Sequence, residues 1–328
     1  MIAFVIRRLL ISIPVLIGST ILTFIMVKQT GDPLGTLKTR QPKVPQHTIQ
    51  LEEHRLGLDQ GVVAGYWHWI SNIVLHGDFG ASTNRTVDIG HQLFLAILVT
   101  GRLVLLSVLI SVILAVVTGV YSAVKQYSIT DYTTTFIGFL FLSMPVFWFA
   151  ILLKQGGIWF NQHVSTGFFG TIGEKSIILT DNSTAGHLKD YAGHLILPTI
   201  VLSLAGYAGW TRFTRASMLE VLNSDYVRLA RSKGLKPRQV LIRHALRTAL
   251  IPLTTVTALD IAALLGGAIV TEQVFQWHGM GNLFLKALRD LDANVMLAWL
   301  LVTATIVILF NLLADILDGV LDPRIRHA

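Results

Sequence analysis

The sequence predicts an all-α protein that crosses a membrane several times. Of its 328 residues, 52% are hydrophobic and 14% are charged, and the mean hydropathy is +0.61. Soluble domains carry about 25% charged residues. The apolar residues gather in uncharged runs, and a run of about 20 residues is enough for a helix to span a bilayer. We therefore expect a polytopic helical membrane protein.

Six segments have the length and apolarity of a membrane-spanning helix. The first follows Arg7 and Arg8, as a secretory signal would, but its apolar core exceeds the usual length of about 7–15 residues and no small-residue cleavage site follows. We predict that it remains as an uncleaved first helix. The fourth is the shortest, and Arg212 and Arg215 follow it at once. The predicted spans are 9–27, 104–124 (alternatively starting nearer Leu93), 135–153, 195–210, 250–271 and 295–313.

Basic residues lie mainly on one side of this predicted bundle. Six spans place both termini on the same side as the turn near Lys125 and the 211–248 segment, which alone carries nine Lys and Arg residues. In the opposite loops, 28–94, 155–193 and 272–293, acids nearly balance bases. The positive-inside rule then places both termini and the 211–248 segment in the cytoplasm. Because the charge is distributed in this way, the net charge of +7 predicts a lipid bilayer rather than nucleic acid as the partner.

The densest basic stretch, SDYVRLARSKGLKPRQVLIRHALRTALIP (224–252), lies between two apolar runs. Ser224 is suited to the N-cap of a helix, and Asp225 to a first turn, where the helix dipole favours an anion. Lys233 falls in the last turn, and Gly234 follows as a C-terminal stop. A helix of about nine residues is too short to be stable alone in water, so it needs a surface to pack on.

The spacing within this helix leaves two interpretations open. Tyr226, Leu229 and Ala230 share one face, an apolar stripe that fits a groove, with Arg228 and Arg231 beside it. The alternative is a solvated loop whose arginines contact anionic lipid headgroups. After the stop, Pro237 suits the first turn of a second helix that leads into the fifth span.

The same stretch resembles a segment of the permease subunits of ATP-binding-cassette (ABC) importers, specifically the first permease of the dipeptide and oligopeptide group. That group's version, Asp-Tyr-Val-Arg-x-Ala-Arg-x-Lys-Gly-Leu, is matched from Asp225 to Leu235, whereas the general Glu-Ala-Ala-x-x-x-Gly motif is matched only at Ala230 and Gly234. The resemblance implies a type I ABC importer permease fold with a coupling helix at about 224–235 that fits a groove on an ATPase subunit. The implied coupling residues are Asp225, Tyr226, Arg228, Leu229, Ala230, Arg231, Lys233 and Gly234.

Shorter motifs extend this resemblance over most of the chain. Each is weak alone, but their order and spacing together are specific, and the 155–193 loop resembles the family least. The motifs are Arg7-Arg8-Leu9-Leu10 with Pro14, Gly18 and Gly31-Asp32-Pro33; Leu56-Gly57-Leu58-Asp59, Trp69 and Gly77-Asp78-Phe79-Gly80 with Ser82; Ser143, Pro145, Phe147 and Trp148; Glu272, Phe275, Trp277, Gly279 and Gly281; and Leu321-Asp322-Pro323-Arg324.

The resemblance also implies an organisation and a set of partners. It divides the chain into an N-terminal transmembrane helix (1–28), an extracytoplasmic segment (29–94), a transmembrane domain (95–316) and a cytoplasmic tail (317–328). It implies a bacterial inner membrane, a second homologous permease, two cytoplasmic ATPase subunits, an extracytoplasmic solute-binding protein and a di- or oligopeptide substrate. ATP and Mg would bind the ATPase subunits, and this chain would bind no cofactor. A nickel or glutathione importer permease is the alternative within the class.

Other classes fit the residues less well. GTIGEKS (170–176) lacks the Gly-x-x-x-x-Gly-Lys-Ser/Thr spacing of a phosphate-binding loop, and no zinc-protease helix or serine nucleophile elbow is present. We therefore expect a transporter subunit rather than an enzyme such as a membrane protease. A secondary transporter driven by an ion gradient would show inverted repeats and paired broken helices, which the sequence does not reveal. The chain has no cysteine and its histidines are scattered, so we expect no metal site.

Three residues within the predicted spans are candidates for the translocation path: Ser143, Pro145 and Asp260. An acid at the centre of a span costs about 2.5–3.5 kcal/mol, so Asp260 should face the bundle interior or a watery cavity. It would either line the path or make an interhelical hydrogen bond, and both interpretations stay open. On the same span, Gly266-Gly267 favours close helix packing or a local bend.

Outside the spans, the 60–75 segment has apolar residues at helical spacing. This pattern predicts an amphipathic helix that lies on the membrane or on the outer mouth of the permease. Such a helix would serve as a structural cap or as a contact for the binding protein. The residues that carry the pattern are Val63, Tyr66, Trp67, Ile70 and Val74.

Overall fold

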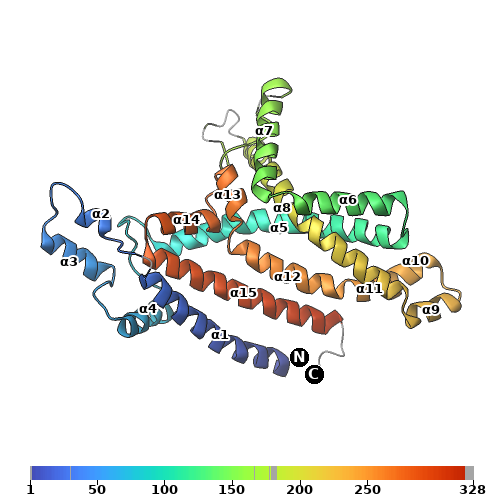
Figure 1. Ribbon diagram of the computed structural model, residues 1–328, viewed down its shortest axis with the longest axis horizontal. Helices are drawn as coiled ribbons and strands as arrows, with labels where there is room; N and C mark the ends of the chain where they lie inside the picture. Colours follow the sequence, from blue (N-terminus) through green and yellow to red (C-terminus); the bar gives the residue numbers. More distant parts are fainter. Residues whose placement is uncertain (1, 30, 166, 177, 179–182, 322–328) are drawn as a thin grey trace.

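The computed structural model describes residues 2–29, 31–165, 167–176, 178 and 183–321. Within these ranges the protein is helical without strands, and its longest helices run along the long axis of the molecule (Figure 1). The elements are α1 (Ile2–Gln29), α2 (Gly35–Lys38), α3 (Gln46–Arg55), α4 (Val62–His76), α5 (Ile89–Val124), α6 (Ile129–Ser143), α7 (Val146–His163), α8 (Thr184–Leu222), α9 (Asp225–Ser232), α10 (Pro237–Gln239), the π-helical η1 (Val240–Ala245), α11 (Leu246–Ala249), α12 (Ile251–Leu265), α13 (Ile269–Phe275), α14 (Met280–Arg289) and α15 (Ala293–Leu321).

Four of the described helices, α1, α5, α8 and α15, are long and apolar enough to cross a membrane. Two bent helix pairs bring the number of spans to six if each pair counts as one. The second predicted span begins earlier than residue 104, near the alternative start at Leu93, since α5 begins at Ile89. The predicted tail, 317–328, lies outside the described residues from 322 onward.

The fourth predicted span, 195–210, is too short. Helix α8 has 39 residues and continues through Arg212 and Arg215. The apolar run ends there, but each arginine finds a partner on α6. Arg215 pairs with Asp131 at 2.7 Å, and the Arg212 guanidinium lies 4.7 Å from the centroid of the Phe139 ring.

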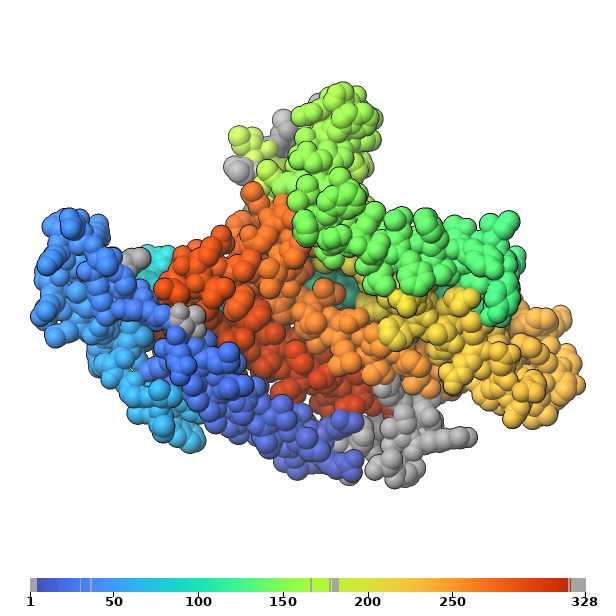
Figure 2. All heavy atoms as spheres, in the orientation of Figure 1, coloured from blue at the N-terminus to red at the C-terminus, as the bar shows by residue number. Residues whose placement is uncertain are grey.

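The third predicted span, 135–153, is not one straight helix. It falls across a break between α6 and α7, whose axes differ by 100°. Met144 has extended backbone angles (φ −79°, ψ 126°) because Pro145 disfavours a helical conformation in the residue before it. As a result α7 turns away from α6 and projects from the bundle, while its first half packs on α8 and α13 (Figures 1 and 2).

The fifth predicted span, 250–271, is also broken. A bend of 45° separates the 237–249 helices from α12, and α12 ends before Gly266. Gly267 has φ +141°, and a Cβ atom built there would lie 2.6 Å from the backbone of Gly281. A Cβ on Gly266 would lie 2.8 Å from the Thr303 side chain. This glycine pair therefore serves both close packing and chain reversal.

Helices α5 and α8 form the centre of the bundle. Small residues let their backbones approach closely, as is common between membrane helices. A Cβ atom on Gly119 would lie 2.9 Å from the carbonyl oxygen of Thr211. The Ser111 hydroxyl donates a hydrogen bond of 2.7 Å to the carbonyl of Ser203. These contacts fix α8, and with it the α9 segment that follows, against α5.

The predicted amphipathic helix outside the spans is present as α4. It packs on α1 through Tyr66, whose hydroxyl lies 2.9 Å from that of Thr20, and through the buried Trp69. The apolar residues divide between two faces. Tyr66 and Ile70 pack on the core, whereas Val63, Trp67 and Val74 are exposed by 73%, 66% and 74%.

Candidate functional site

The short basic helix predicted between two spans is present as α9, at the opposite end of the molecule from α2 and α3 (Figure 1). Ser224 occupies the N-cap position with extended backbone angles, but its hydroxyl donates to the Val221 carbonyl (2.6 Å) and does not cap α9. Asp225 lies in the first turn. Lys233 ends the helix, and Gly234 follows with φ +75°. The stop at Gly234 is therefore as the sequence predicts.

One side of α9 is buried against its own chain. Val227 and Ala230 are 0% and 6% exposed. The predicted apolar stripe of Tyr226, Leu229 and Ala230 is therefore divided, because Ala230 is buried against this chain whereas Tyr226 and Leu229 are exposed. The surface beneath α9 consists of small and medium apolar side chains from α5, α8, η1 and α11: Ala123, Met218, Val221, Val240, Ala245 and Ala249.

The other side of α9 forms an exposed face that combines an aromatic, an apolar and several charged groups. Tyr226 is 43% exposed and Leu229 is 57% exposed. Arg228 contacts Asp225 at 3.3 Å and donates to the carbonyl of Asn223 at 3.2 Å. We call the exposed members together the α9 exposed face: Asp225, Tyr226, Arg228, Leu229, Arg231 and Lys233.

The chain after α9 forms the second helix that Pro237 predicts. Pro237 is the first residue of α10, where its missing N–H is of no consequence. The helix then passes through the π-helical turn η1, and Val240 and Ala245 from this turn pack in the same cluster as Val227 and Ala230. π-Helical turns are rare and occur frequently at functional sites. This turn and the 45° bend that follows separate α9 from α12.

A buried ion pair joins α8 to α6 near α9. Arg215 donates two parallel hydrogen bonds to Asp131, from Nε to Oδ1 at 2.7 Å and from a terminal nitrogen to Oδ2 at 2.8 Å. Ser122, near the end of α5, donates to the same carboxylate, as does the Tyr127 backbone N–H at 2.9 Å. The Asp131 side chain is 3% exposed and that of Arg215 is 28% exposed. The two carboxylate oxygens are thus fully used, which is the condition for a stable buried pair.

Sequence reasoning missed this ion pair. In the sequence Arg215 marks only the limit of a span, and no pattern singles out Asp131. The available signal was a lone acid and a lone base, each beside a long apolar run. A single charge in such a place needs a partner, but the pairing of two residues that lie 84 positions apart in sequence is a property of the tertiary structure.

The candidate path residues Ser143 and Pro145 lie at the break between α6 and α7, and both are exposed. The Ser143 hydroxyl donates to the carbonyl of Leu140 at 2.9 Å, within its own helix. The structure therefore places both residues at an elbow rather than inside a straight span.

Asp260 makes an interhelical hydrogen bond. It accepts from the indole N–H of Trp210 on α8, with Nε1 to Oδ2 at 2.6 Å. The residue is nevertheless exposed in the single chain, so the carboxylate is tied to α8 and also open to one side. Asp260 lies on α12, whereas the elbow residues lie at the junction of α6 and α7. Within the described part of the chain, no group of His, Asp and Glu side chains is placed to hold a metal ion.

At the other end of the bundle, the motif residues after the fifth span form a hairpin of α13 and α14. Glu272 is fully buried and accepts hydrogen bonds from Thr100 Oγ1 (2.7 Å) and from the Asn282 backbone N–H (2.9 Å), in the first turn of α14. The Thr100 hydroxyl in turn accepts from the Met280 backbone N–H at 2.8 Å. Burial raises the pKa of the Glu272 carboxyl, and the backbone donors act in the other direction. A Cβ atom on Gly279 would lie 2.6 Å from this carboxylate, so only glycine fits there.

A second buried carboxylate attaches the outer motif of residues 77–83 to the start of α15. Asp292 accepts from the Ser82 hydroxyl at 2.6 Å and from the Thr83 hydroxyl and backbone N–H at 2.8 and 2.9 Å. Asn294 donates to the carbonyl of Ala81 at 2.7 Å. The Gly77–Ser82 motif therefore has a structural role in holding the N-terminal segment to the bundle.

The sequence matches known transport proteins over most of its length. Residues 115–327 match the family described as "Binding-protein-dependent transport system inner membrane component", and residues 1–91 match the family of its N-terminal part. This chain belongs to that family. It is thus the multi-pass inner-membrane component of a binding-protein-dependent transport system and not itself an enzyme.

Curated relatives match over their full length. The oligopeptide transport system permease protein AppB of Bacillus subtilis (strain 168) is 39% identical over 329 residues, with 100% of both chains covered. The corresponding OppB of Mycobacterium tuberculosis (strain ATCC 25618 / H37Rv) is 37% identical and covers 98% of both. The dipeptide transport system permease protein DppB of Escherichia coli (strain K12) is 36% identical, covering 100% of this chain and 99% of its own.

A solved structure confirms the fold. The MetNI methionine ABC transporter in its inward-facing conformation has a chain that matches with a TM-score of 0.51 at 18% identity, over 70% of this chain and 96% of that one. The expected type I ABC importer fold is thereby confirmed. The two bent helix pairs, which the sequence did not reveal, occur within this fold and so do not favour a secondary transporter.

Proposed function

We propose that this chain is the permease subunit of an ATP-driven importer of di- or oligopeptides, that it forms half of the translocation path, and that α9 is the helix that couples it to an ATPase. One observation carries the coupling role: an eight-residue helix is anchored on one side by Val227 and Ala230, while the residues of the α9 exposed face lie at the surface. The names of the curated relatives at 36–39% identity support the peptide substrate.

The proposed assembly contains three kinds of partner subunit. A second, homologous permease completes the path, two ATPase subunits bind at the α9 end, and a solute-binding protein docks at the opposite end. ATP and Mg bind the ATPase subunits, and this chain holds no cofactor. The family description, which names a binding protein, supports the last of these partners. The projecting α7, with Phe147, Trp148 and Trp159 exposed, supplies apolar surface suited to a second permease.

In the proposed topology, both termini and α9 lie in the cytoplasm. The nine Lys and Arg residues of the 211–248 segment support this orientation. The α13–α14 hairpin and α2 to α4 then lie on the extracytoplasmic side.

The packing beneath α9 suggests how motion would pass into the membrane. Cluster contacts tie α9 to α5 and α8, and the ion pair between Asp131 and Arg215 ties this unit to α6. The link to α12 is more compliant, because it runs through a π-helical turn and a bend. A displacement of α9 by the ATPase would therefore move α5, α6 and α8 as a rigid body, and would reach the elbow at Ser143 and Pro145.

The path itself is proposed to pass Ser143, Pro145 and Asp260. Asp260 would contribute an exposed carboxylate held in position by Trp210. Such a group suits the ammonium group at the amino terminus of a peptide, since opposite charges attract strongly where water is scarce.

The test of the coupling role replaces Leu229 on the α9 exposed face. Leu229→Glu puts a charge into what would be a largely apolar groove contact, where the charge cannot be solvated. We expect normal membrane insertion and either loss of co-purifying ATPase or loss of the rise in ATP hydrolysis that loaded binding protein causes. Leu229→Met, which conserves volume, is the matched control and should behave as wild type.

Wild-type stimulation of ATP hydrolysis in Leu229→Glu would remove α9 from the coupling role. Ala230→Glu should act differently from Leu229→Glu. Because Ala230 is buried against this chain's own helices, the substitution should reduce the stability of the isolated permease as well as its coupling.

A further inference from the structure

Helix α4 lies outside the spans, yet it exposes an apolar side. Val63, Trp67 and Val74 follow one another at i, i+4 and i+11, so they share one side of the helix, and all three are exposed. The 15 residues of α4 include no Asp, Glu, Lys or Arg. A helix with one side in water ordinarily carries charged and polar residues there, so this side of α4 lacks the groups that a solvated surface usually has.

The charged residues of α1 show how deep α4 lies. No charged residue lies between Arg8 and Lys28 on this helix. A rise of about 1.5 Å per residue separates these two by about 30 Å, which is the thickness of the hydrocarbon core of a bilayer. Lys28 therefore marks one boundary of that core. Its Nζ donates to the carbonyl of Gln60 at 2.8 Å, so the start of α4 lies at this boundary.

The contacts that α4 makes with α1 lie further inside the core. The centroid of the Phe24 ring is 5.6 Å from that of Tyr66 and 5.8 Å from that of Trp69. The Tyr66 hydroxyl lies 2.9 Å from that of Thr20. Along α1, Phe24 and Thr20 precede Lys28 by about 6 and 12 Å. The inner side of α4 thus reaches below the boundary, as it does in helices that lie in the membrane interface and are buried there by about 5–10 Å.

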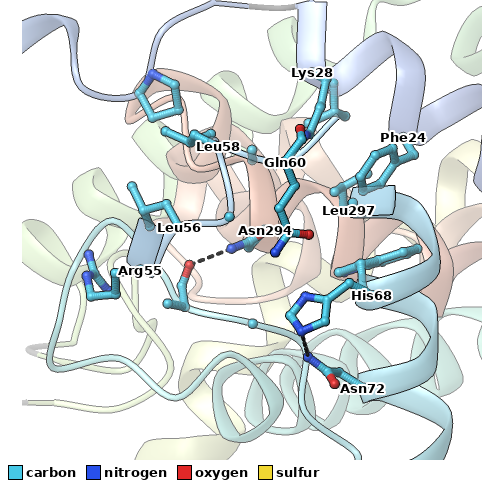
Figure 3. Close-up of a pocket in the computed structure, with 18 of the residues that line it drawn as sticks. Phe24, Lys28, Arg55, Leu56, Leu58, Gln60, His68, Asn72, Asn294 and Leu297 are labelled. Carbon is cyan, nitrogen blue, oxygen red and sulfur yellow. Dashed lines mark hydrogen bonds between the residues drawn. The ribbon is translucent and has the colours of Figure 1, made fainter. Parts of the chain in front are cut away.

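A third side of α4 is polar and faces a cavity. His68 follows Trp67 and so lies about 100° further around the helix. Its Nε2 lies 3.4 Å from the side-chain nitrogen of Asn72. Both side chains line the cavity between α1, α4 and α15 (Figure 3). Helix α4 therefore has separate packed, polar and apolar sides, and the apolar side is the exposed one that is turned away from this cavity.

We propose that α4 lies in the plane of the membrane interface, with Val63, Trp67 and Val74 inserted among the acyl chains of one leaflet. Apolar side chains gain free energy by leaving water, and Trp is enriched at this level of the membrane. At the same depth α1 exposes Leu22 and Met26, by 59% and 60%. The inserted helix would hold the end of α1 at the membrane surface. Only the choice of leaflet, the outer one, rests on the proposed topology.

The solute-binding protein is the other partner that the sequence allows for α4. That protein approaches from the water phase, whereas the contacts with Thr20 and Phe24 place α4 at the level of lipid. The apolar side of α4 also carries no Lys or Arg. Its attachment to lipid would therefore not depend on anionic headgroups, which act through basic residues.

The test measures the depth of α4 with spin labels in the complete importer, reconstituted in nanodiscs of phosphatidylcholine. This chain has no cysteine, so single cysteines can be labelled once those of the partner subunits are replaced. For Val63→Cys and Val74→Cys we expect a ratio of oxygen collisions to collisions with a water-soluble nickel chelate that is severalfold above the ratio for Arg40→Cys, in the exposed loop before α3. His68→Cys, on the polar side of the same helix, is the matched control and should give a ratio close to that of Arg40→Cys.

A charge on the apolar side provides a second test. Val74→Glu should move α4 toward water, because a carboxylate is not solvated among acyl chains, and should lower the collision ratio at Val63→Cys severalfold. Val74→Leu stays apolar and should leave that ratio unchanged. Addition of phosphatidylglycerol should also leave it unchanged, and a change would contradict attachment through apolar side chains.

Three other outcomes would overturn the proposal. Equal collision ratios at Val63→Cys, Val74→Cys and Arg40→Cys would place the apolar side in water. Protection from the nickel chelate only after addition of the binding protein would assign this side to that protein. Labels that neither reagent reaches would assign it to a protein contact within the importer. The measurement requires neither ATP hydrolysis nor transport, so its failure is distinguishable from failure of the proposed function.

Discussion

The two ends of the bundle are held together by different kinds of contact. At the α9 end, small apolar side chains such as Ala123, Ala230 and Ala245 pack on one another. At the α13–α14 end, the buried carboxylates of Glu272 and Asp292 bind hydroxyl groups and backbone N–H groups from segments far away in the sequence.

This difference has a mechanical consequence. A buried carboxylate fixes its neighbours in one arrangement, because displacement leaves donors unsatisfied at a cost of about 1–3 kcal/mol each. Contacts between small apolar side chains are not directional, so helices that share them can shift as units at lower cost. The α9 end, which we propose moves with the ATPase, therefore lacks such directional contacts, apart from the ion pair that joins α6 to α8.

The largest expected effect is at the clamp of the α13–α14 hairpin. Glu272→Ala leaves the Thr100 hydroxyl and the Asn282 N–H without an acceptor and opens a cavity in a fully buried site. We expect a loss of about 4 kcal/mol in stability, from two orphaned donors and the missing volume. A fall in the thermal unfolding temperature of the detergent-solubilised chain measures it.

Glu272→Gln is the control for that clamp. The amide keeps one carbonyl acceptor and nearly the same volume, so about half of the loss should be restored. Equal unfolding temperatures for Glu272→Ala and wild type would show that the hairpin does not depend on this carboxylate.

A smaller effect is expected where the α9 end does carry a directional contact. Arg215→Lys keeps the charge but cannot form the two parallel bonds to Asp131. Arg215→Ala should cost about 3 kcal/mol, the low end for a buried pair, because the Arg215 side chain is 28% exposed.

The functional readout of the ion pair is the ratio of transport to ATP hydrolysis. If the pair carries motion from α9 to α6, Arg215→Lys should lower this ratio severalfold and leave basal hydrolysis near wild type. Arg212→Lys, three residues earlier on α8, is the matched control and should leave the ratio unchanged. A wild-type ratio in Arg215→Lys would mean that the pair only stabilises the fold.

Substitutions at Gly234 test the α9 end through the backbone conformation at that residue. A Cβ atom at Gly234 meets nothing within 4 Å, so its φ of +75° is the one obstacle to a side chain. Gly234→Val should cost about 1–2 kcal/mol locally and redirect the chain after α9, with loss of substrate-stimulated ATP turnover. Gly234→Asn should retain most of the turnover, since Asn tolerates this conformation. Equal turnover in both variants and wild type would contradict a role for the α9 stop.

The smallest effect on stability is expected at Asp260. The amide of Asp260→Asn can still accept from Trp210, so stability should change by less than about 1 kcal/mol. If the carboxylate lines the path, uptake of cationic and neutral peptides should change unequally. A substrate profile identical to wild type, measured by competition uptake in vesicles, would limit Asp260 to its interhelical hydrogen bond.

The sequence by itself determined the class of fold, the position of α9 and its stop. Apolar runs of membrane-spanning length predict helices wherever they occur, because lipid leaves no other way to satisfy the backbone. Asp225, Gly234 and Pro237 act within a few residues of themselves, so their effects on helix ends could be predicted locally. The motifs that resemble the permease family identified it before any contact was known.

The tertiary structure alone decided which side of α9 is buried and where two spans break. An eight-residue helix with Tyr226, Val227, Leu229 and Ala230 has apolar residues around much of its circumference, so only the helices beneath it select Val227 and Ala230. A break in the helix before Pro145 could be predicted from the proline, but the angle of 100° between α6 and α7 depends on what α7 packs against. The pairing of Asp131 with Arg215 arises between segments distant in sequence, where no local pattern records it.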